Sequence, residues 1–290
     1  MVVLVVGGLG QLGQSIQFIS SKYPEISFQY VDVNEMDITD EVQVQNKFQQ
    51  IKPQYCINAA AYTAVDKAES DVDKAHAINV TGVENIAKAC KQNHTILLHI
   101  STDFVFDGNQ TTPYTENDEP NPLGVYGQTK LDGEKVIPTI LDTYYIVRTS
   151  WLYSQFGANF MKTMIKLGQE RETLSVVNDQ IGTPTHAVDL ATALIKIILT
   201  DYKNLKSQIS NLKSYGLYHF SNEGQCSWYD FAAKIFELNN IKINLLPIPT
   251  SAYPTPAKRP VYSVLDKSKI KETFDLTIKN WEESLKFYLL

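Results

Sequence analysis

Residues 2–13 read Val2-Val3-Leu4-Val5-Val6-Gly7-Gly8-Leu9-Gly10-Gln11-Leu12-Gly13. The first five are all apolar, which is typical of a strand buried on both faces. The glycines follow at once, and a helical stripe of Leu12, Ile16 and Ile19 comes after them. Strand, glycine turn and helix predict a dinucleotide-binding loop, because glycine lets the backbone turn sharply and approach a pyrophosphate. The free N–H groups at the helix start would bind the phosphates.

The glycine spacing alone also occurs in turns of unrelated α/β folds, and only its neighbours favour the dinucleotide interpretation. Further apolar runs predict strands at 28–33, 55–60, 96–100 and 145–147, with amphipathic helical patterns between them. This alternation predicts a doubly wound, mostly parallel α/β sheet of the Rossmann type. We expect residues 1–150 to form the dinucleotide-binding domain.

Residues 151–290 have a less regular pattern and predict a smaller α/β region that mainly binds substrate. Some of its segments are expected to return and pack on the first domain. We expect strands at 174–177 and 217–220, a helix at 189–199, and Ser227 as the N-cap of another helix. Five prolines between Pro247 and Pro260 predict an extended loop.

Composition excludes several classes of protein. A formal net charge of −6 argues against nucleic-acid binding, and no run of about 18 apolar residues predicts a membrane span. The first residues are expected to be a strand and not a signal peptide. Cys56, Cys90 and Cys226 are far apart, so we expect buried thiols and a cytoplasmic protein. No His-Glu-x-x-His motif occurs, and no metal site is predicted.

Asp32 lies at the end of the second predicted strand, about 20 residues beyond the glycines. A carboxylate there can accept hydrogen bonds from the adenosine ribose. No Arg or Lys among residues 33–35 could hold a 2′-phosphate, so this region by itself favours NADH over NADPH. A solvated carboxylate at a strand end is the alternative interpretation.

Tyr126 and Lys130 are four residues apart and would share one face of a helix. A nearby ammonium lowers the pKa of a tyrosine and favours acid–base chemistry. The pair is more informative than the same spacing elsewhere because it lies downstream of the glycine loop and of a strand that begins at Ile96 and ends in Ser101, Thr102 and Asp103. Asn58 could end a strand beside the cofactor and Asn79 could brace the active-site helix through the backbone, although both are also common turn or cap residues.

Five longer strings carry a family resemblance. They are Asn58-Ala59-Ala60-Ala61-Tyr62-Thr63-Ala64-Val65-Asp66-Lys67-Ala68-Glu69, Ser101-Thr102-Asp103-Phe104-Val105-Phe106-Asp107-Gly108, Val147-Arg148-Thr149-Ser150-Trp151-Leu152-Tyr153, Asn178-Asp179-Gln180-Ile181-Gly182-Thr183-Pro184-Thr185 and Tyr253-Pro254-Thr255-Pro256-Ala257-Lys258-Arg259-Pro260. In this order the chain resembles the dTDP-4-dehydrorhamnose reductases of the extended short-chain dehydrogenase/reductase family, from residue 2 to about residue 281.

The resemblance implies reduction of the C4 ketone of dTDP-4-dehydro-L-rhamnose to dTDP-L-rhamnose by hydride from NAD(P)H, with Tyr126 as proton donor. It implies Thr102, Tyr126 and Lys130 as catalytic residues, and Thr102, Asp103 and Trp151 as sugar contacts. The residues expected to line the cofactor are Gly7, Gly10, Gln11, Leu12, Gly13, Asp32, Asp37, Ile38, Ala61, Tyr62, Thr63, Tyr126 and Lys130. Arg259 suits a nucleotide phosphate, with a solvated charge as the alternative, and Trp151 could be a core aromatic.

Two features depart from the family pattern. The family generally uses NADPH, whereas residues 33–35 contain no Arg or Lys that could bind its 2′-phosphate. From the resemblance we expect NADPH as the cofactor, with NADH as the alternative. Some relatives join subunits through magnesium held by carboxylates, one of them just past the glycine loop. Ser15 stands at that place here and the chain ends soon after Trp281, so magnesium-linked dimerisation is doubtful. A homodimer of another kind stays open.

Two rival functions remain. A nucleotide-sugar 4,6-dehydratase needs an Asp-Glu pair after the threonine, but Phe104 follows Thr102 and Asp103 here. An epimerase is harder to exclude, although it should retain its cofactor permanently. A non-catalytic subunit resembling the methionine adenosyltransferase beta subunit would have no need of Thr102, Tyr126 and Lys130 together.

Overall fold

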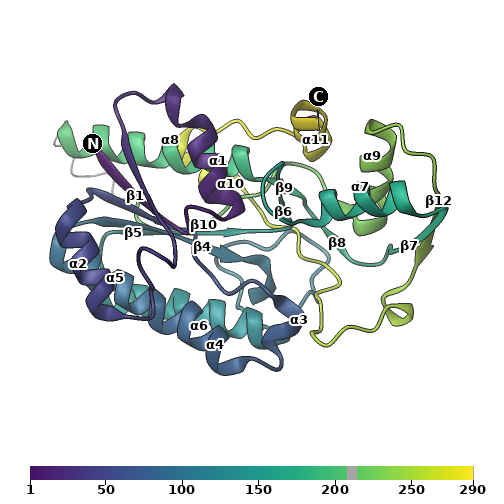
Figure 1. Cartoon of the computed structure of the whole chain (residues 1–290), viewed down its shortest axis with the longest axis horizontal. Helices are drawn as coiled ribbons and strands as arrows, with labels where there is room; N and C mark the ends of the chain where they lie inside the picture. Colours follow the sequence, from purple (N-terminus) through teal and green to yellow (C-terminus); the bar gives the residue numbers. More distant parts are fainter. Residues whose placement is uncertain (208–213, 290) are drawn as a thin grey trace.

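A parallel sheet forms the centre of the molecule (Figure 1). The computed structural model describes residues 1–207 and 214–289. Six strands pair in the order β2-β1-β3-β4-β5-β10. Their bounds are Val2–Val6 for β1, Ser27–Val31 for β2, Tyr55–Asn58 for β3, Ile96–Thr102 for β4, Tyr144–Thr149 for β5 and Gly216–His219 for β10. The predicted doubly wound parallel sheet is confirmed. The strand order reverses between β1 and β3, so a ligand crevice is expected at their carboxyl ends.

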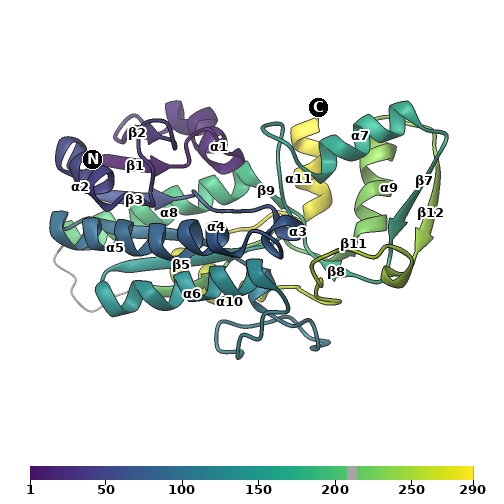
Figure 2. The same ribbon diagram turned by 60° about the horizontal axis from the view of Figure 1, so that its bottom comes forward.

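Helices cover both faces of this sheet (Figures 1 and 2). One layer contains α1 (Gln11–Ile19), α8 (Ala187–Lys206) and α10 (Ser268–Phe274), and the other contains α2 (Glu41–Ile51), α5 (Gly82–Asn93) and α6 (Val125–Ile140). In β1, Val3 and Val5 join the core under α1 and α8, whereas Leu4 and Val6 join the core under α2 and α5. This two-sided burial explains the unbroken apolar run. The short helical segments are η1 (Ser20–Lys22), α3 (Val65–Ala68), α4 (Val72–His76), η2 (Ala77–Thr81) and η3 (Asp103–Val105).

A smaller lobe lies beside the sheet and has its own apolar core (Figure 2). Its helices are α7 (Phe160–Glu170), α9 (Trp228–Leu238) and α11 (Trp281–Leu289), with the turn η4 at Thr250–Ala252. Its strand pairs are β7 (Thr173–Val177) with β12 (Asn244–Ile248), β8 (Ile181–Gly182) with β11 (Cys226–Ser227), and β6 (Leu152–Tyr153) with β9 (Thr185–His186). Ser227 caps α9 as predicted, in a capping box with Asp230.

Several predicted boundaries were wrong. β2 ends at Val31 and alternates between exposed and partly buried residues, because it is an edge strand of the sheet. β3 ends at Asn58, two residues before the end of its apolar run, and β4 ends at Thr102, one residue before Asp103. Pro247 was predicted in a loop, yet it lies in β12 opposite Val176. A two-stranded sheet consists of edge strands, and these tolerate a missing N–H donor.

Segments beyond residue 150 return to the large sheet. β10 pairs with β5, and α8 packs against α1. The domain boundary at residue 150 stays a prediction. All three cysteines are free and buried, as expected. Among the described residues, no helix combines the length and apolar character that crossing a bilayer demands.

Candidate active site

The glycine loop forms a tight cradle at the β1–β3 crevice. Gly7 has φ +82°, and a Cβ there would lie 2.8 Å from the Ala60 backbone nitrogen. A Cβ on Gly13 would lie 2.4 Å from the Gly7 carbonyl oxygen, so α1 packs directly on the turn. No side chain caps the start of α1 after Gly10. The first N–H groups of α1 and the absence of side chains around them fit the pyrophosphate of a dinucleotide.

Asp32 braces this cradle from the end of β2. Its carboxylate accepts hydrogen bonds from the Leu9 N–H and from the Val33 N–H, both at 2.9 Å. It is therefore neither a purely solvated charge nor a free acceptor. Ile38 is buried over Gly82, and its carbonyl accepts a hydrogen bond from Asn85. Asp37 accepts hydrogen bonds from the Thr39 N–H and hydroxyl.

Two residues that the resemblance implies as cofactor contacts have their side chains engaged elsewhere. Leu12 is buried in the core under α1 and α8. The Gln11 amide reaches the smaller lobe, where its oxygen accepts hydrogen bonds from Ser154 at 3.2 Å and Asn159 at 2.9 Å. Gln11 and Leu12 can therefore bind a phosphate only through their backbone N–H groups at the start of α1.

Asn79 links Tyr62, a predicted cofactor contact, to α6, the helix that carries Tyr126 and Lys130. Its side chain accepts a hydrogen bond from the Tyr62 N–H at 2.8 Å and donates to the Tyr62 carbonyl at 3.2 Å. It also donates to the Thr129 hydroxyl at 3.1 Å, one residue before Lys130. The sequence predicted a brace through the backbone. In the structure, Asn79 instead contacts the helix through the Thr129 side chain. Ala61 and Thr63 flank this clamp and are accessible to solvent.

Tyr126 lies in the first turn of α6, partly buried against Phe104. The two rings meet edge to face, with centroids 5.5 Å apart. Burial raises the pKa of Tyr126 to about 12, the nearby Thr102 hydroxyl opposes this shift, and the Asp103 carboxylate adds to it. The phenol therefore keeps its proton at neutral pH.

Lys130 lies one turn further along α6 and is only 1% exposed. Its Nζ donates a hydrogen bond to the Ile100 carbonyl at 2.7 Å and lies 3.4 Å from His99 Nε2. Burial lowers the pKa of Lys130 to about 8, and the Glu134 carboxylate opposes that shift. Burial, together with Lys130, lowers the pKa of His99 well below its ordinary value.

The end of β4 brings Thr102 and Asp103 next to Tyr126. The Thr102 hydroxyl donates to Asp103 Oδ1 at 3.1 Å and accepts from the Phe104 N–H at 3.2 Å. Burial raises the pKa of Asp103 to about 6, while hydrogen bonds from Ser263 and Thr102 act in the opposite direction. Within the described residues, Asp103 Oδ2 has no hydrogen-bond partner. Ser101, the second predicted hydroxyl, instead donates to Glu134 on α6.

Trp151 has a strained backbone at the entrance to the smaller lobe. Its φ is +45°, which is rare for a bulky residue and is found at functional sites. The indole stacks on Trp228 with centroids 3.5 Å apart and planes at 9°. Gly182 lies on the ring, since a Cβ there would come within 2.5 Å of it. Trp151 thus has a fixed orientation.

Arg259 forms an ion pair with Asp66 of α3, at 2.8 Å between Nη2 and Oδ2. It also donates to Thr255 and to the Ala257 carbonyl of its own loop. The guanidinium lowers the pKa of Asp66. Arg259 is therefore not a solvated charge, and a nucleotide phosphate would have to share it with Asp66.

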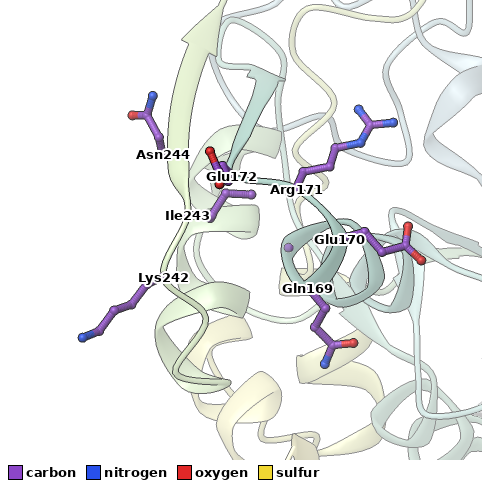
Figure 3. A pocket seen from close by; sticks show the side chains of 8 residues that line it. Gln169, Glu170, Arg171, Glu172, Lys242, Ile243 and Asn244 are labelled. Atoms are coloured by element: carbon purple, nitrogen blue, oxygen red, sulfur yellow. The ribbon is translucent and has the colours of Figure 1, made fainter.

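Two surface hollows lie away from the predicted residues. The larger, about 580 Å³, is lined by residues 168–172 and 242–244 at one end of the smaller lobe, where the labelled side chains point in different directions (Figure 3). The other, about 360 Å³, is lined by residues of α9 and α11 together with Gln225 and Cys226. In residues 1–207 and 214–289, no three metal-ligating side chains cluster.

Sequence reasoning missed several partners of the predicted residues. The sequence patterns do not single out His99, Asp66, Trp228 or the buried Glu134–Arg148 ion pair. The alternation along β4 could have indicated that His99 and Ser101 share a face. The other contacts join residues far apart in the sequence and have no local signal.

A parallel sheet with a glycine cradle at its switch point, and with Tyr and Lys one helical turn apart beside it, defines a dinucleotide-dependent reductase of the short-chain dehydrogenase/reductase class. The family model described as the RmlD substrate binding domain matches residues 1–290. The chain belongs to the dTDP-4-dehydrorhamnose reductase family.

Named relatives support this assignment. The dTDP-4-dehydrorhamnose reductase of Aggregatibacter actinomycetemcomitans is 40% identical, over 98% of this chain and 97% of its own length. The crystal structure of that enzyme from Clostridium acetobutylicum is 45% identical with a TM-score of 0.91, covering 100% of this chain and 98% of its own. The Bacillus anthracis enzyme, in complex with NADP, is 41% identical with a TM-score of 0.92, covering 99% and 98%.

Proposed function

We propose that this chain reduces the C4 ketone of dTDP-4-dehydro-L-rhamnose to dTDP-L-rhamnose, with NADPH as the hydride donor and NADH as the alternative. The observation that carries the proposal is the pair of Tyr126 and Lys130 on α6, with Tyr126 beside Thr102 and Asp103 at the end of β4. In the sheet, β3 lies between β4 and the strand β1 that leads into the glycine loop. When bound, the reduced nicotinamide supplies the hydride to C4. The relatives that match nearly the full length of this chain carry the name of this activity.

Tyr126 is the proposed proton donor. A phenol with a pKa of about 12 is protonated at neutral pH and can give its proton to O4 as negative charge develops there. The phenolate that results is stabilised when Lys130, one helical turn away, carries its charge. Thr102 is proposed to hydrogen-bond O4, since its hydroxyl can rotate from Asp103 toward the substrate.

Residues 151–290 are proposed to supply most of the substrate side. From the other side of the site, Asp103 Oδ2 has no hydrogen-bond partner among the described residues and can accept a hydrogen bond from a sugar hydroxyl. Trp151 offers the fixed edge of an indole, held by Trp228 and Gly182. Arg259 suits the diphosphate, with Asp66 keeping the guanidinium oriented until the nucleotide arrives. We further propose a cytoplasmic location, which the three free thiols support.

The test is turnover of the named substrate. The purified chain is given dTDP-4-dehydro-L-rhamnose made by upstream enzymes, and loss of reduced nicotinamide absorbance is followed with NADPH and with NADH. The expected product is dTDP-L-rhamnose, identified by NMR.

Other outcomes would overturn the proposal. Interconversion of sugar nucleotides by a protein that retains its cofactor through purification would indicate an epimerase. An inert chain that co-purifies with an unrelated enzyme would indicate a regulatory subunit.

A further inference from the structure

A row of buried polar side chains crosses the sheet on the face that α6 covers. The row consists of Asn58 on β3, His99 and Ser101 on β4, Arg148 on β5 and His219 on β10. Asn58 pairs in register with His99, and Arg148 pairs with both Ser101 and His219. Each of the five is at most 4% exposed. Buried polar groups are usually hydrogen-bonded, so the partners of each donor and acceptor in the row can be traced. Among the described residues, Arg148 Nη1 and His219 Nε2 have no partner, whereas the polar side-chain atoms of Asn58 and His99 all do.

The amide of Asn58 determines which nitrogen of His99 carries the proton. Its Oδ1 accepts a hydrogen bond from the Ala60 N–H at 3.2 Å, so its Nδ2 is the atom that faces His99 Nδ1 at 3.1 Å. An amide nitrogen only donates, and His99 Nδ1 must therefore accept. Burial keeps the ring neutral, and a neutral imidazole with a bare Nδ1 carries its proton on Nε2.

The Nε2–H of His99 is directed at Lys130 Nζ, 3.4 Å away. An ammonium has three donors and no acceptor, whereas a neutral amine has a lone pair. The neutral amine completes the chain, because it accepts from His99 and donates to the Ile100 carbonyl at 2.7 Å. An ammonium would set two donors against each other.

We infer that His99, held in its Nε2–H tautomer by Asn58, is a positioning residue that stabilises the neutral amine of Lys130 over the ammonium. The orientation of the Asn58 amide thereby determines the tautomer of His99, and that tautomer influences the charge of Lys130. The inference itself needs only the cofactor-free protein, and its consequence for turnover rests on the proposed function.

Other charged or titratable groups around Lys130 do not replace His99 in this role. Glu134 on α6 favours the ammonium, but its carboxylate is paired with Arg148 of β5 at 2.6 Å and accepts from Ser101. Asp103 of η3 acts on the Tyr126 phenol, and η2 contributes the uncharged Asn79. His99 is the ring in direct contact with Nζ, so removing it should change the charge state of Lys130 most directly.

The test measures the titration of Lys130 without substrate. In protein labelled with 13C-lysine, the Lys130 13Cε resonance is assigned by its loss in Lys130→Arg and followed against pH. His99→Leu should raise the pKa of Lys130 by about one pH unit, the shift that one lost hydrogen bond to the neutral form produces. His186→Leu, which removes a fully buried histidine outside the row, should leave this titration unchanged.

A second variant keeps the histidine but reverses its tautomer. In Asn58→Asp, a carboxylate accepts from Nδ1–H and leaves Nε2 bare, so the ammonium of Lys130 is favoured and its pKa should also rise. The 15N resonances of the His99 ring should show a protonated Nε2 in the wild type and a protonated Nδ1 in Asn58→Asp. A protonated Nδ1 in the wild type, or an unchanged Lys130 titration in both variants, would overturn the inference.

The same variants have an expected effect on turnover. Activity should fall as Lys130 loses its charge above about pH 8, and both variants should move this alkaline limb of kcat/KM to higher pH. A chain that fails to reduce the proposed substrate but shows the NMR shifts would refute the proposed function alone. Normal turnover with unmoved NMR titrations and an unmoved limb would refute the role of His99 alone.

Discussion

The amino and carboxyl ends of the parallel strands differ in how fully their buried carboxylates are hydrogen-bonded. At the amino end, the Tyr55 and Tyr145 hydroxyls donate to the two carboxylate oxygens of Asp201, at 2.7 and 2.8 Å. At the carboxyl end, Asp103 has an oxygen without a partner among the described residues, and Lys130 Nζ lies 3.4 Å from His99 Nε2. Each oxygen of the Asp201 carboxylate thus has a hydrogen-bond donor, whereas one oxygen of the Asp103 carboxylate has none.

From this difference we infer that the carboxyl end is where the molecule performs its chemistry. Burial raises the pKa of Tyr55 and Tyr145 far from neutral pH, so both phenols are locked as donors. At the other end, burial lowers the pKa of Lys130 to about 8 and raises that of Asp103 to about 6. The pKa values of both groups are therefore shifted toward neutral pH. Groups arranged in this way are typical of functional sites, whereas matched clusters stabilise.

The largest expected effect is a loss of activity from a substitution at the carboxyl end of the strands. Tyr126→Phe removes the proposed proton donor and should lower kcat by about two orders of magnitude or more, the scale of a lost general acid. KM should change little, because the ring and its contact with Phe104 remain. Steady-state kinetics checks this, with Tyr145→Phe at the amino end as the matched control. Wild-type kcat in Tyr126→Phe would refute the mechanism.

A smaller effect concerns stability and pH. Because the folded pKa of Asp103 is raised to about 6, the folded state disfavours the ionised carboxylate, and stability is lost as pH rises from about 4 through 6. Asp103→Asn should therefore stabilise the chain at pH 7 by about 1–3 kcal/mol and have little effect near pH 4. Urea unfolding at both pH values measures this.

Asp107→Asn is the matched control for that experiment. Hydrogen bonds led by the one from the Asn109 N–H lower the pKa of Asp107, so its carboxylate stabilises the fold above its ordinary pKa, and the substitution should destabilise at pH 7. Destabilisation by Asp103→Asn at pH 7 would show that its buried carboxylate is matched after all, and the contrast between the two ends would fail.

The smallest effect is expected at the amino end. Tyr55→Phe removes one of the two phenol donors to Asp201 and should destabilise the chain by about 1–2 kcal/mol, while kcat and KM stay unchanged. Urea unfolding combined with the turnover assay measures both quantities. A fall in activity without a loss of stability would mean that this cluster also serves the reaction.

Most of the fold and part of the site could be predicted from local patterns. The run of apolar residues before Gly7, the glycine spacing and the one-turn separation of Tyr126 and Lys130 each involve neighbours in the chain. A residue's neighbours determine its backbone geometry, so such features are readable without a structure. The roles of these residues remain predictions until the variants are measured.

Tertiary structure decided what surrounds them. Gln11 bonds Asn159 across 148 residues, and Arg259 bonds Asp66 across 193. The sequence by itself determined a dinucleotide-binding parallel sheet with a candidate acid and lysine, because strand, turn and helix follow from local spacing. Only the packed sheet set His99 between Asn58 and Lys130, since partners in neighbouring strands meet through register and burial.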